Sequence, residues 1–290
     1  MKLAFFILKL LSHLPHPILR GIAKILGWLS YHLVTSRTQV GLINLAACFP
    51  EKNLAERKCI LREHYYQMAL SVLEYSRYWY ADAQTLKQQV QYRDKHFLDE
   101  TLAQGKNVIM LYPHFTAFEA AVYALNQDVP LISVYSHQKN KALDEQILKG
   151  RHRYNNVFLV GRTEGLRGII KHIKNSNAPF LYLPDQDFGA KDSVFVPFFG
   201  IPTATITGLS RIAKLTQAAV IPTIPTRLPN GTVELRFYPA WDNFPSNDVI
   251  ADTTRMNAFI EARVREQPEQ YFWLHKRFKT RPQGMPPFYD

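Results

Sequence analysis

Residues 107–119 read NVIMLYPHFTAFE and decide the fold of this chain. The first six residues form an apolar run closed by a proline, which is the pattern of a buried strand. The last residues are helix formers, and Thr116 followed three positions later by Glu119 fits a capping box that starts a helix. His114 is therefore expected in the turn between strand and helix, where open α/β sheets bind their ligands.

Strand and helix patterns alternate along the chain from about residue 94 onward. The candidate strands are 107–112, 131–135, 157–160, 178–183, 219–225 and 232–238. The candidate helices are 94–104, 117–126, 139–150, 164–174, 205–217 and 251–267. Such alternation predicts an α/β fold, with helices layered on both faces of a mostly parallel sheet.

The composition limits the classes of function. The chain has 290 residues and is 47% hydrophobic, so it can bury a large core. Its net charge of +11 favours an anionic partner such as nucleic acid, an acidic protein or a membrane surface. Two cysteines argue against a disulfide framework. The sequence has no dinucleotide, P-loop, nucleophile-elbow, zinc or nucleic-acid signature, so no cofactor and no nucleic acid are expected.

The first 34 residues differ from the rest. Two apolar runs, 3–14 and 18–34, are separated by prolines and carry a few lysines and arginines. Each run is shorter than the ~20 apolar residues of a simple membrane span. We interpret residues 1–34 as an uncleaved membrane anchor and 35–290 as a catalytic domain, with 35–51 as a connector before a long helix over 56–80. The alternative is an ordinary amphipathic helix packed on the core.

His114 and Glu119 are the candidate catalytic residues. A spacing of five does not put two residues on one helix face, but it suits a histidine in a turn and a glutamate folded back from the first helical turn. His114 would act as a general base, and Glu119 would hold its tautomer while the acceptor hydroxyl attacks an acyl carbonyl. The alternative is that Glu119 only caps the helix and His114 is a loop residue.

Further charged residues are candidates for binding substrate. Guanidinium groups hold carboxylates and phosphates in a fork, which makes the arginines near residue 151 candidates for an anionic head group or an acyl carbonyl. The two aspartates after the strand at 178–183 could bind a divalent metal and a nucleotide sugar, or hold basic residues of the site in place. The C-terminal basic segment is a third candidate. The residues concerned are Arg151, Arg153, Arg162, Asp185, Asp187, Lys276 and Arg277.

Several motifs together resemble one known family, the late (secondary) lipid A acyltransferases of Gram-negative inner membranes, and most closely its lauroyl transferases. The resemblance covers nearly the whole chain, from the apolar N-terminus to the basic C-terminal segment. Its motifs are Arg37, Asn44-Leu45, CFPE (48–51), Pro113-His114 with Glu119, DQDFG (185–189), SVFVPFF (193–199) and HKRFKTRP (275–282).

The resemblance implies a fold, a site and substrates. The fold would be related to the glycerol-3-phosphate acyltransferases, and the family's His-x4-acid dyad would fall on His114 and Glu119. The helper arginine would be Arg151 or Arg153, with no decision between them. The donor would be acyl-acyl carrier protein and the acceptor a Kdo-bearing lipid A precursor (Kdo2-lipid IVA), at the cytoplasmic face of the bacterial inner membrane.

We therefore expect an O-acyltransferase that moves a lauroyl-type chain. A basic face suits both substrates, since acyl carrier protein is acidic and the acceptor carries phosphates and sugar carboxylates. Phe115, Phe118, Phe195, Phe198 and Phe199 could line an acyl pocket or belong to the core. The alternatives are a glycerophospholipid acyltransferase, a metal-dependent glycosyltransferase using the two aspartates, and a non-enzymatic basic protein at the membrane surface.

Overall fold

A seven-stranded sheet forms the centre of the chain in the computed structural model, which describes residues 2–155, 157–161 and 165–289. Its strands are β1 (Val90–Arg93), β2 (Val108–Leu111), β3 (Leu131–Tyr135), β4 (Val157–Gly161), β5 (Phe180–Tyr182), β8 (Ala219–Arg227) and β9 (Val233–Phe237). They lie in the order β1-β9-β8-β2-β5-β3-β4. A separate antiparallel hairpin is made of β6 (Ser193–Phe198) and β7 (Ile201–Ile206).

Five neighbouring strands, from β8 to β4, run parallel to one another, which confirms the predicted fold class. β9 pairs with β8 in the antiparallel sense, and β1 lies parallel to β9 at the edge. The parallel strands are connected through the helices α7 (Phe118–Leu125), α8 (Lys141–Arg151), α9 (Gly165–Ser176) and α10 (Gly208–Thr216). The other helices after residue 80 are α5 (Ala83–Gln89), α6 (His96–Ala103) and α11 (Val249–Glu266).

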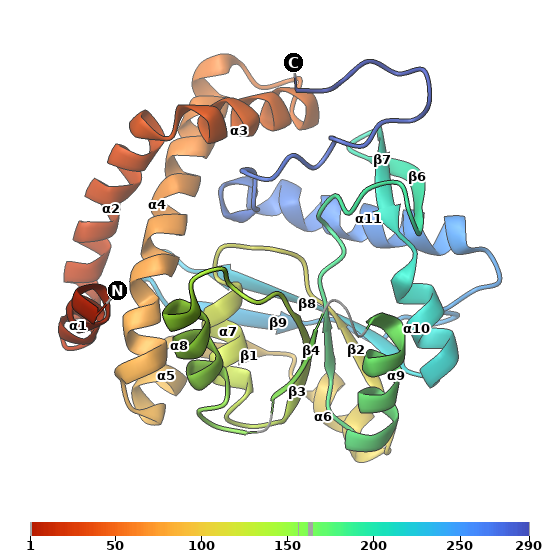
Figure 1. The fold of residues 1–290 in the computed structure, drawn as a ribbon. Helices are drawn as coiled ribbons and strands as arrows, with labels where there is room; N and C mark the ends of the chain where they lie inside the picture. Colours follow the sequence, from red (N-terminus) through yellow and green to blue (C-terminus); the bar gives the residue numbers. More distant parts are fainter. Residues whose placement is uncertain (1, 156, 162–164, 290) are drawn as a thin grey trace.

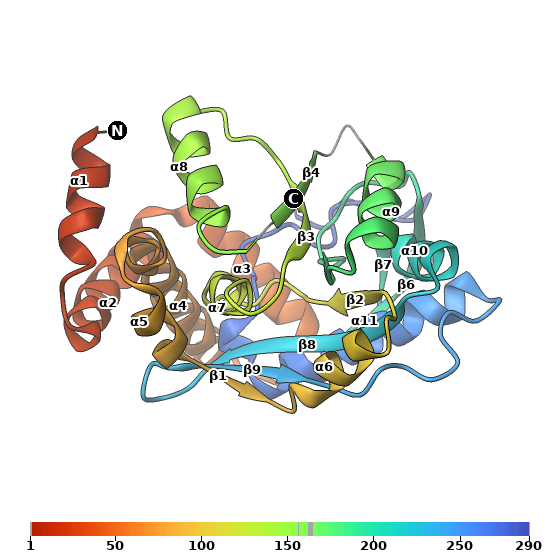
Figure 2. The ribbon, with the colours of Figure 1, turned by 90° about the horizontal axis from the view of Figure 1, so that it is seen from below.

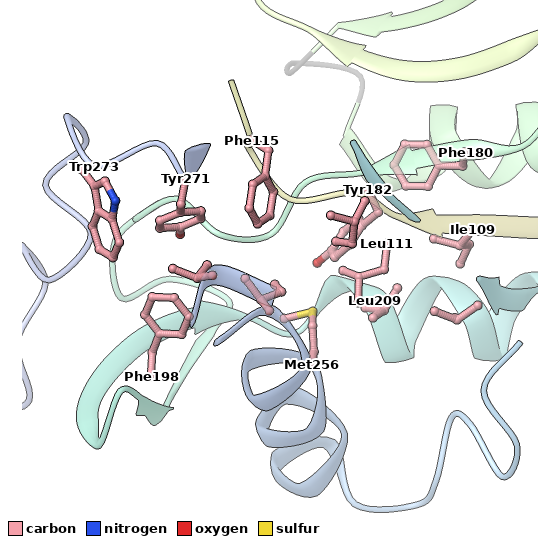
Figure 3. Packing of buried hydrophobic residues seen from close by; sticks show 14 of the residues in the cluster. Ile109, Leu111, Phe115, Phe180, Tyr182, Phe198, Leu209, Met256, Tyr271 and Trp273 are labelled. Atoms are coloured by element: carbon pink, nitrogen blue, oxygen red, sulfur yellow. The ribbon is translucent and has the colours of Figure 1, made fainter. Parts of the chain in front are cut away.

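Both faces of the sheet are buried. Successive residues of β2 point to opposite sides: Ile109 and Leu111 join one apolar cluster, whereas Val108 and Met110 join another. The first cluster continues into α9, α10 and α11, and Figure 3 shows Leu209 and Met256 beside the β2 and β5 side chains. This explains why the central strands read as continuous apolar runs and not as alternating ones.

The first helices form a group beside the sheet. They are α1 (Lys2–Leu11), α2 (His16–Leu33), α3 (Thr35–Cys48) and α4 (Leu54–Tyr80). α2 runs along α4, and both figures place α1 and α2 at one end of the molecule and α9 and α10 at the other (Figures 1 and 2). No helix of the described chain has an apolar stretch long enough to cross a bilayer.

Every strand predicted between 107 and 238 is present, as are the six helices predicted beyond residue 94. The expected connector 35–51 is wrong, because residues 35–48 form α3. This helix has little amphipathic pattern, and long-range contacts hold it instead: the Asn44 amide donates to the carbonyl oxygens of Trp273 and His275 at 2.8 and 2.9 Å. The helix predicted from 205 begins at Gly208, since residues 205 and 206 end β7.

Candidate active site

Two neighbouring strands bring the first site residues together. β2 lies beside β5 in parallel, with Leu111 opposite Tyr182. His114 follows Leu111 by three residues, and Asp185 follows Tyr182 by three residues. Because the two strands end at the same edge of the sheet and in the same register, the side chains of His114 and Asp185 meet just beyond that edge.

Asp185 holds His114 through two hydrogen bonds. The backbone amide of His114 donates to Oδ2 at 2.9 Å, and Nδ1 of the ring lies 2.8 Å from Oδ1. Since a carboxylate only accepts, Nδ1 carries a proton, and Nε2 is the ring nitrogen left to exchange a proton with a substrate. Burial by itself would raise the pKa of Asp185, but the nearby His114 outweighs this and leaves the pKa lowered. The aspartate is thus kept ionised where it stabilises a positive imidazolium.

Glu119 does not bind His114 as expected. Its Oε1 forms an ion pair with Nη2 of Arg151, and both side chains are largely buried, with 6% and 13% of their surface exposed. Glu119 also contributes, after burial, to the raised pKa of Tyr75. The prediction that Glu119 orients the imidazole is therefore wrong in this structure, because Asp185 already occupies Nδ1 and Arg151 binds the Glu119 carboxylate.

The predicted capping box is wrong for the same reason. α7 has Ala117 at its N-cap and no capping side chain, and the Thr116 hydroxyl has no hydrogen-bond partner among the described residues. The Glu119 carboxylate pairs with Arg151, at the end of α8, and not with the start of its own helix.

A cavity of about 590 Å³ opens beside His114. Its volume is within the ~300–1,000 Å³ usual for ligand sites. The wall combines apolar side chains from β3, β5, α9 and α10 with a few polar groups, among them His114, Arg151, Gln186 and Arg211. Phe118 lines it as well, whereas Phe115, Phe198 and Phe199 are buried in the core and Phe195 is exposed. An apolar cavity with convergent polar groups suits a ligand that has both a hydrocarbon part and a charged part.

Of the two candidate helper arginines, the structure brings Arg151 to the cavity. Arg153 is used elsewhere, since its guanidinium donates to the carbonyl oxygens of Tyr78 and Ala81 at the end of α4. Arg162 lies outside the described residues.

Asp187 forms hydrogen bonds with the protein itself. Its carboxylate accepts from the amide and hydroxyl of Thr280, at 2.7 and 2.8 Å, and from the amide of Gly189. Its own amide donates to Nε2 of His275. These bonds tie the loop after β5 to the C-terminal segment, so of the two earlier interpretations of the aspartates the one that fits is that they hold other residues in place.

The C-terminal basic residues are not at the cavity. Arg277 is buried, and its guanidinium donates to the Ala204 carbonyl and the Thr205 hydroxyl on β7, at 2.7 and 2.9 Å. Burial lowers its pKa. Lys276 is exposed and lies over the ring of Tyr289. The expectation that both bind substrate is therefore wrong for Arg277, which is buried with both Nη groups bonded to β7, and has no support from the position of Lys276.

Sequence reasoning did not find Gln186 and Arg211, which line the cavity. Gln186 stands between Asp185 and Asp187 just after β5, and the rule that parallel strands end at one edge of the sheet could have found it. Arg211 lies in a helix whose start was misplaced by three residues, so the sequence held no clear signal for it.

Comparison with known proteins gives a consistent result. The family model described as bacterial lipid A biosynthesis acyltransferase matches residues 2–280. The lipid A biosynthesis lauroyltransferase of Escherichia coli (strain K12) is 30% identical over 285 residues, covering 98% of this chain and 92% of that protein. A lipid A biosynthesis acyltransferase of Haemophilus influenzae is 34% identical, covering 96% and 89%.

Among solved structures, the 1-acyl-sn-glycerophosphate acyltransferase of Thermotoga maritima is similar, with 13% identity and a TM-score of 0.40 over 86% of this chain and 97% of that one. The family model and the relatives, which span nearly the full length, carry the assignment. The chain belongs to the bacterial lipid A biosynthesis acyltransferase family and is an acyltransferase of lipid A biosynthesis.

Proposed function

We propose that this protein transfers a lauroyl-type chain from acyl-acyl carrier protein to a hydroxyl of a Kdo-bearing lipid A precursor, Kdo2-lipid IVA. The observation that carries the proposal is the placement of His114. Its Nδ1 is held by the buried Asp185, and the residue lines a cavity with room for an acyl chain. Family membership favours this reaction over the glycosyltransferase and the non-enzymatic alternatives, and the relatives' lipid A chemistry favours it over glycerophospholipid acylation.

In the proposed reaction His114 is the general base. Nε2 removes the proton of the acceptor hydroxyl while that oxygen attacks the thioester carbonyl carbon. Asp185 stabilises the imidazolium that forms, as it keeps the ring in one orientation. When the tetrahedral intermediate collapses, the carbon–sulfur bond breaks and the imidazolium returns the proton to the leaving thiolate. The products are the acylated lipid and the free carrier thiol, so no other reactant is needed.

Arg151 is the group we assign to the acyl carbonyl or a neighbouring anionic group. It lines the cavity, and its pairing with Glu119 compensates for the loss of hydration of its charge. Glu119 therefore acts through Arg151 by holding the guanidinium on the cavity wall. This assigns Glu119 a positioning role in place of the direct contact with His114.

We also propose that residues 1–34 lie in the interface of the inner membrane, on its cytoplasmic face. Leu19, Ala23, Gly27 and Tyr31 of α2 are buried. The predicted apolar face of α2 is exposed at Ile18, Ile25, Leu29 and Leu33, whereas Ile22 is partly buried against α4. Exposed large apolar residues on α1 continue it at Leu3, Phe6, Ile7 and Leu10. An exposed apolar surface of this size is stabilised by contact with the lipid acyl chains. The basic residues of the same helices would then lie at the level of the anionic head groups.

The test is a transfer assay with purified protein in mixed vesicles. Lauroyl-acyl carrier protein and Kdo2-lipid IVA should give a product one acyl chain heavier, measured by mass spectrometry. Lauroyl-coenzyme A with lysophosphatidic acid should not. His114→Ala should lose about 10² to 10⁴ in kcat, the usual contribution of a general base, while the protein stays folded. Near-normal turnover in that variant would refute the mechanism.

A further inference from the structure

The helix α10 begins in the wall of the cavity. Thr207, its N-cap residue, and Gly208, its first residue, line the cavity together with Arg211. No side chain caps this end, and the first turn contains no acidic residue. The first amides of a helix have no partner within it and carry partial positive charge, so an uncapped start facing a cavity attracts an anion.

Arg211 stands at the unfavourable end of this helix. A cation in the first turn is repelled by the helix dipole, whereas one in the last turn is stabilised. Arg211 is exposed at the cavity, and within the described residues its guanidinium has no hydrogen bond or ion pair. Asp192 is the one carboxylate among the described residues that line the cavity, and it forms no ion pair with Arg211. A bound anion would remove this conflict, since it would be attracted by both the helix and the guanidinium.

A buried hydroxyl points to the same place. Tyr182 is 5% exposed, lines the cavity, and its hydroxyl has no hydrogen-bond partner among the described residues. It lies at the start of α10, because a Cβ on Gly208 would be only 2.8 Å from the hydroxyl oxygen. Burial raises the pKa of Tyr182, and the nearby amides of Leu209 and Gly208, which face the hydroxyl oxygen without closing a hydrogen bond to it, partly oppose this rise. The phenol therefore keeps its proton and is able to donate it.

We propose that the start of α10, with Arg211 and Tyr182, binds a phosphate group of one of the substrates. A phosphate oxygen would accept from the Tyr182 hydroxyl and from the first amides of the helix, and the guanidinium would pair with the remaining charge. The glycine at 208 allows the start of α10 to lie close to the Tyr182 hydroxyl, since a side chain at this position would clash with that hydroxyl. The inference rests on the proposed function, in which both substrates bring phosphate: the sugar phosphates of the acceptor and the phosphopantetheine of the donor.

Kinetics of Arg211→Gln and Tyr182→Phe test the site. We expect each to raise KM for the phosphate-bearing substrate roughly 10- to 100-fold, the range for a hydrogen bond to a charged group, with kcat changed less than threefold. Lys214→Gln is the matched control, because Lys214 is exposed in the last turn of the same helix and does not line the cavity. Its KM values should stay within twofold of those of the wild type.

The source of the phosphate follows from which KM rises. If the acceptor supplies it, the effect of Arg211→Gln disappears with an acceptor whose sugar phosphates have been removed. If the donor supplies it, the effect disappears with a thioester that lacks phosphopantetheine phosphate. KM values within twofold of wild type in both cavity variants, or equal changes in Lys214→Gln, would overturn the proposal.

A direct measurement separates this site from the proposed reaction. Inorganic phosphate added to the full-length protein should broaden its ³¹P resonance, and Arg211→Gln should abolish the broadening while Lys214→Gln retains it. This result would support the site even if no acyl transfer were found, in which case only the proposed function would fail. Equal broadening in wild type and Arg211→Gln counts against the site regardless of activity.

Discussion

Asp185 binds His114 at two points, through the backbone amide at 2.9 Å and through ring Nδ1 at 2.8 Å. The double contact fixes both the turn and the ring. The carboxylate is 3% exposed, whereas the histidine side chain is 21% exposed at the cavity. A buried acid that holds a half-buried base leaves one ring nitrogen, Nε2, free to react.

Replacing Asp185 by asparagine should reduce kcat by about 10² to 10⁴, because the variant keeps the shape but loses the charge that stabilises the imidazolium. KM for both substrates should change little, since the side chain is buried behind the histidine. Steady-state kinetics with both substrates measure this.

Asp187→Asn is the matched control. The carboxylate of Asp187 binds Thr280 and Gly189 and does not contact His114. Asp187→Asn should therefore lower the unfolding temperature and leave kcat within a few-fold of wild type. Equal losses of kcat in the two variants would show that Asp185 has no special role.

The pair Glu119 and Arg151 should behave as a unit. Glu119→Ala leaves a buried guanidinium unpaired, which typically costs about 3–5 kcal/mol of stability. The double variant Glu119→Gln/Arg151→Gln removes both charges, so it should recover much of that stability but not the activity. Urea unfolding and transfer assays on the single and double variants distinguish the two effects. A double variant as active as wild type would exclude the pair from catalysis.

Much of the sheet could be predicted, because its central strands are buried on both faces and appear as apolar runs bounded by glycine and proline. The strands that were missed have weaker signals. β1 is a four-residue edge strand with only one fully buried position, and β6 and β7 form a hairpin in a segment rich in proline and aromatics. α3 was not predicted because its own sequence has little amphipathic pattern, and two of the hydrogen bonds that hold it, from Asn44, go to residues more than 200 positions away.

The site was predicted only in part. The spacing of His114 and Glu119 indicated a turn and a helix, but spacing within one segment cannot show that Asp185 arrives from a neighbouring strand. The strand order β2-β5 decides that pairing, and it is a property of the whole sheet. Likewise, the charges of Arg151 and Arg277 look alike in the sequence, whereas the fold places one at the cavity and the other in the core.

Stability should fall between pH 6.5 and 4 because of His64. This residue is fully buried, and burial lowers its pKa to about 4, with a small opposing effect of the Glu269 carbonyl. The unfolded chain binds a proton at its ordinary pKa of 6.5, while the folded protein does not, so acid favours unfolding in that window. The loss should be about 2 kcal/mol at pH 5 relative to pH 7.

Thermal unfolding between pH 7 and 4 measures the effect, and His64→Asn supplies the comparison, since asparagine does not titrate. His275, whose pKa is also lowered, is present in both proteins. The variant should be less sensitive to acid, and parallel curves for the two proteins would contradict the assignment.

The contact of α2 with α4 should depend on Gly27. A Cβ at this position would lie 2.7 Å from the Cα of Tyr66 and 2.8 Å from its amide nitrogen, so the backbones would have to separate. Gly27→Ala should therefore destabilise the protein by about 1–3 kcal/mol. Gly21→Ala on the same helix is the control: its Cβ meets nothing within 4 Å, and alanine should add up to about 1 kcal/mol. Urea midpoints that shift in the same direction for both variants would contradict this packing.

The exposed apolar side chains of α2, among them Trp28 and Leu29, should govern binding to lipid. Trp28 and Leu29 are 61% and 37% exposed, so replacing both by serine removes apolar surface without opening the core. Burying one such side chain contributes about 1.5–3 kcal/mol. Because two side chains are partly immersed, the double variant should partition to anionic vesicles at least ~10-fold more weakly.

Leu215→Ser is the control, because Leu215 is also exposed but lies on α10, at the other end of the molecule (Figure 1). Vesicle sedimentation at low and high salt measures the change. If the helix lies in the interface, the double variant binds weakly at both salt concentrations and the control binds as wild type does. If both bind equally, the attachment of this protein to membranes depends on another surface.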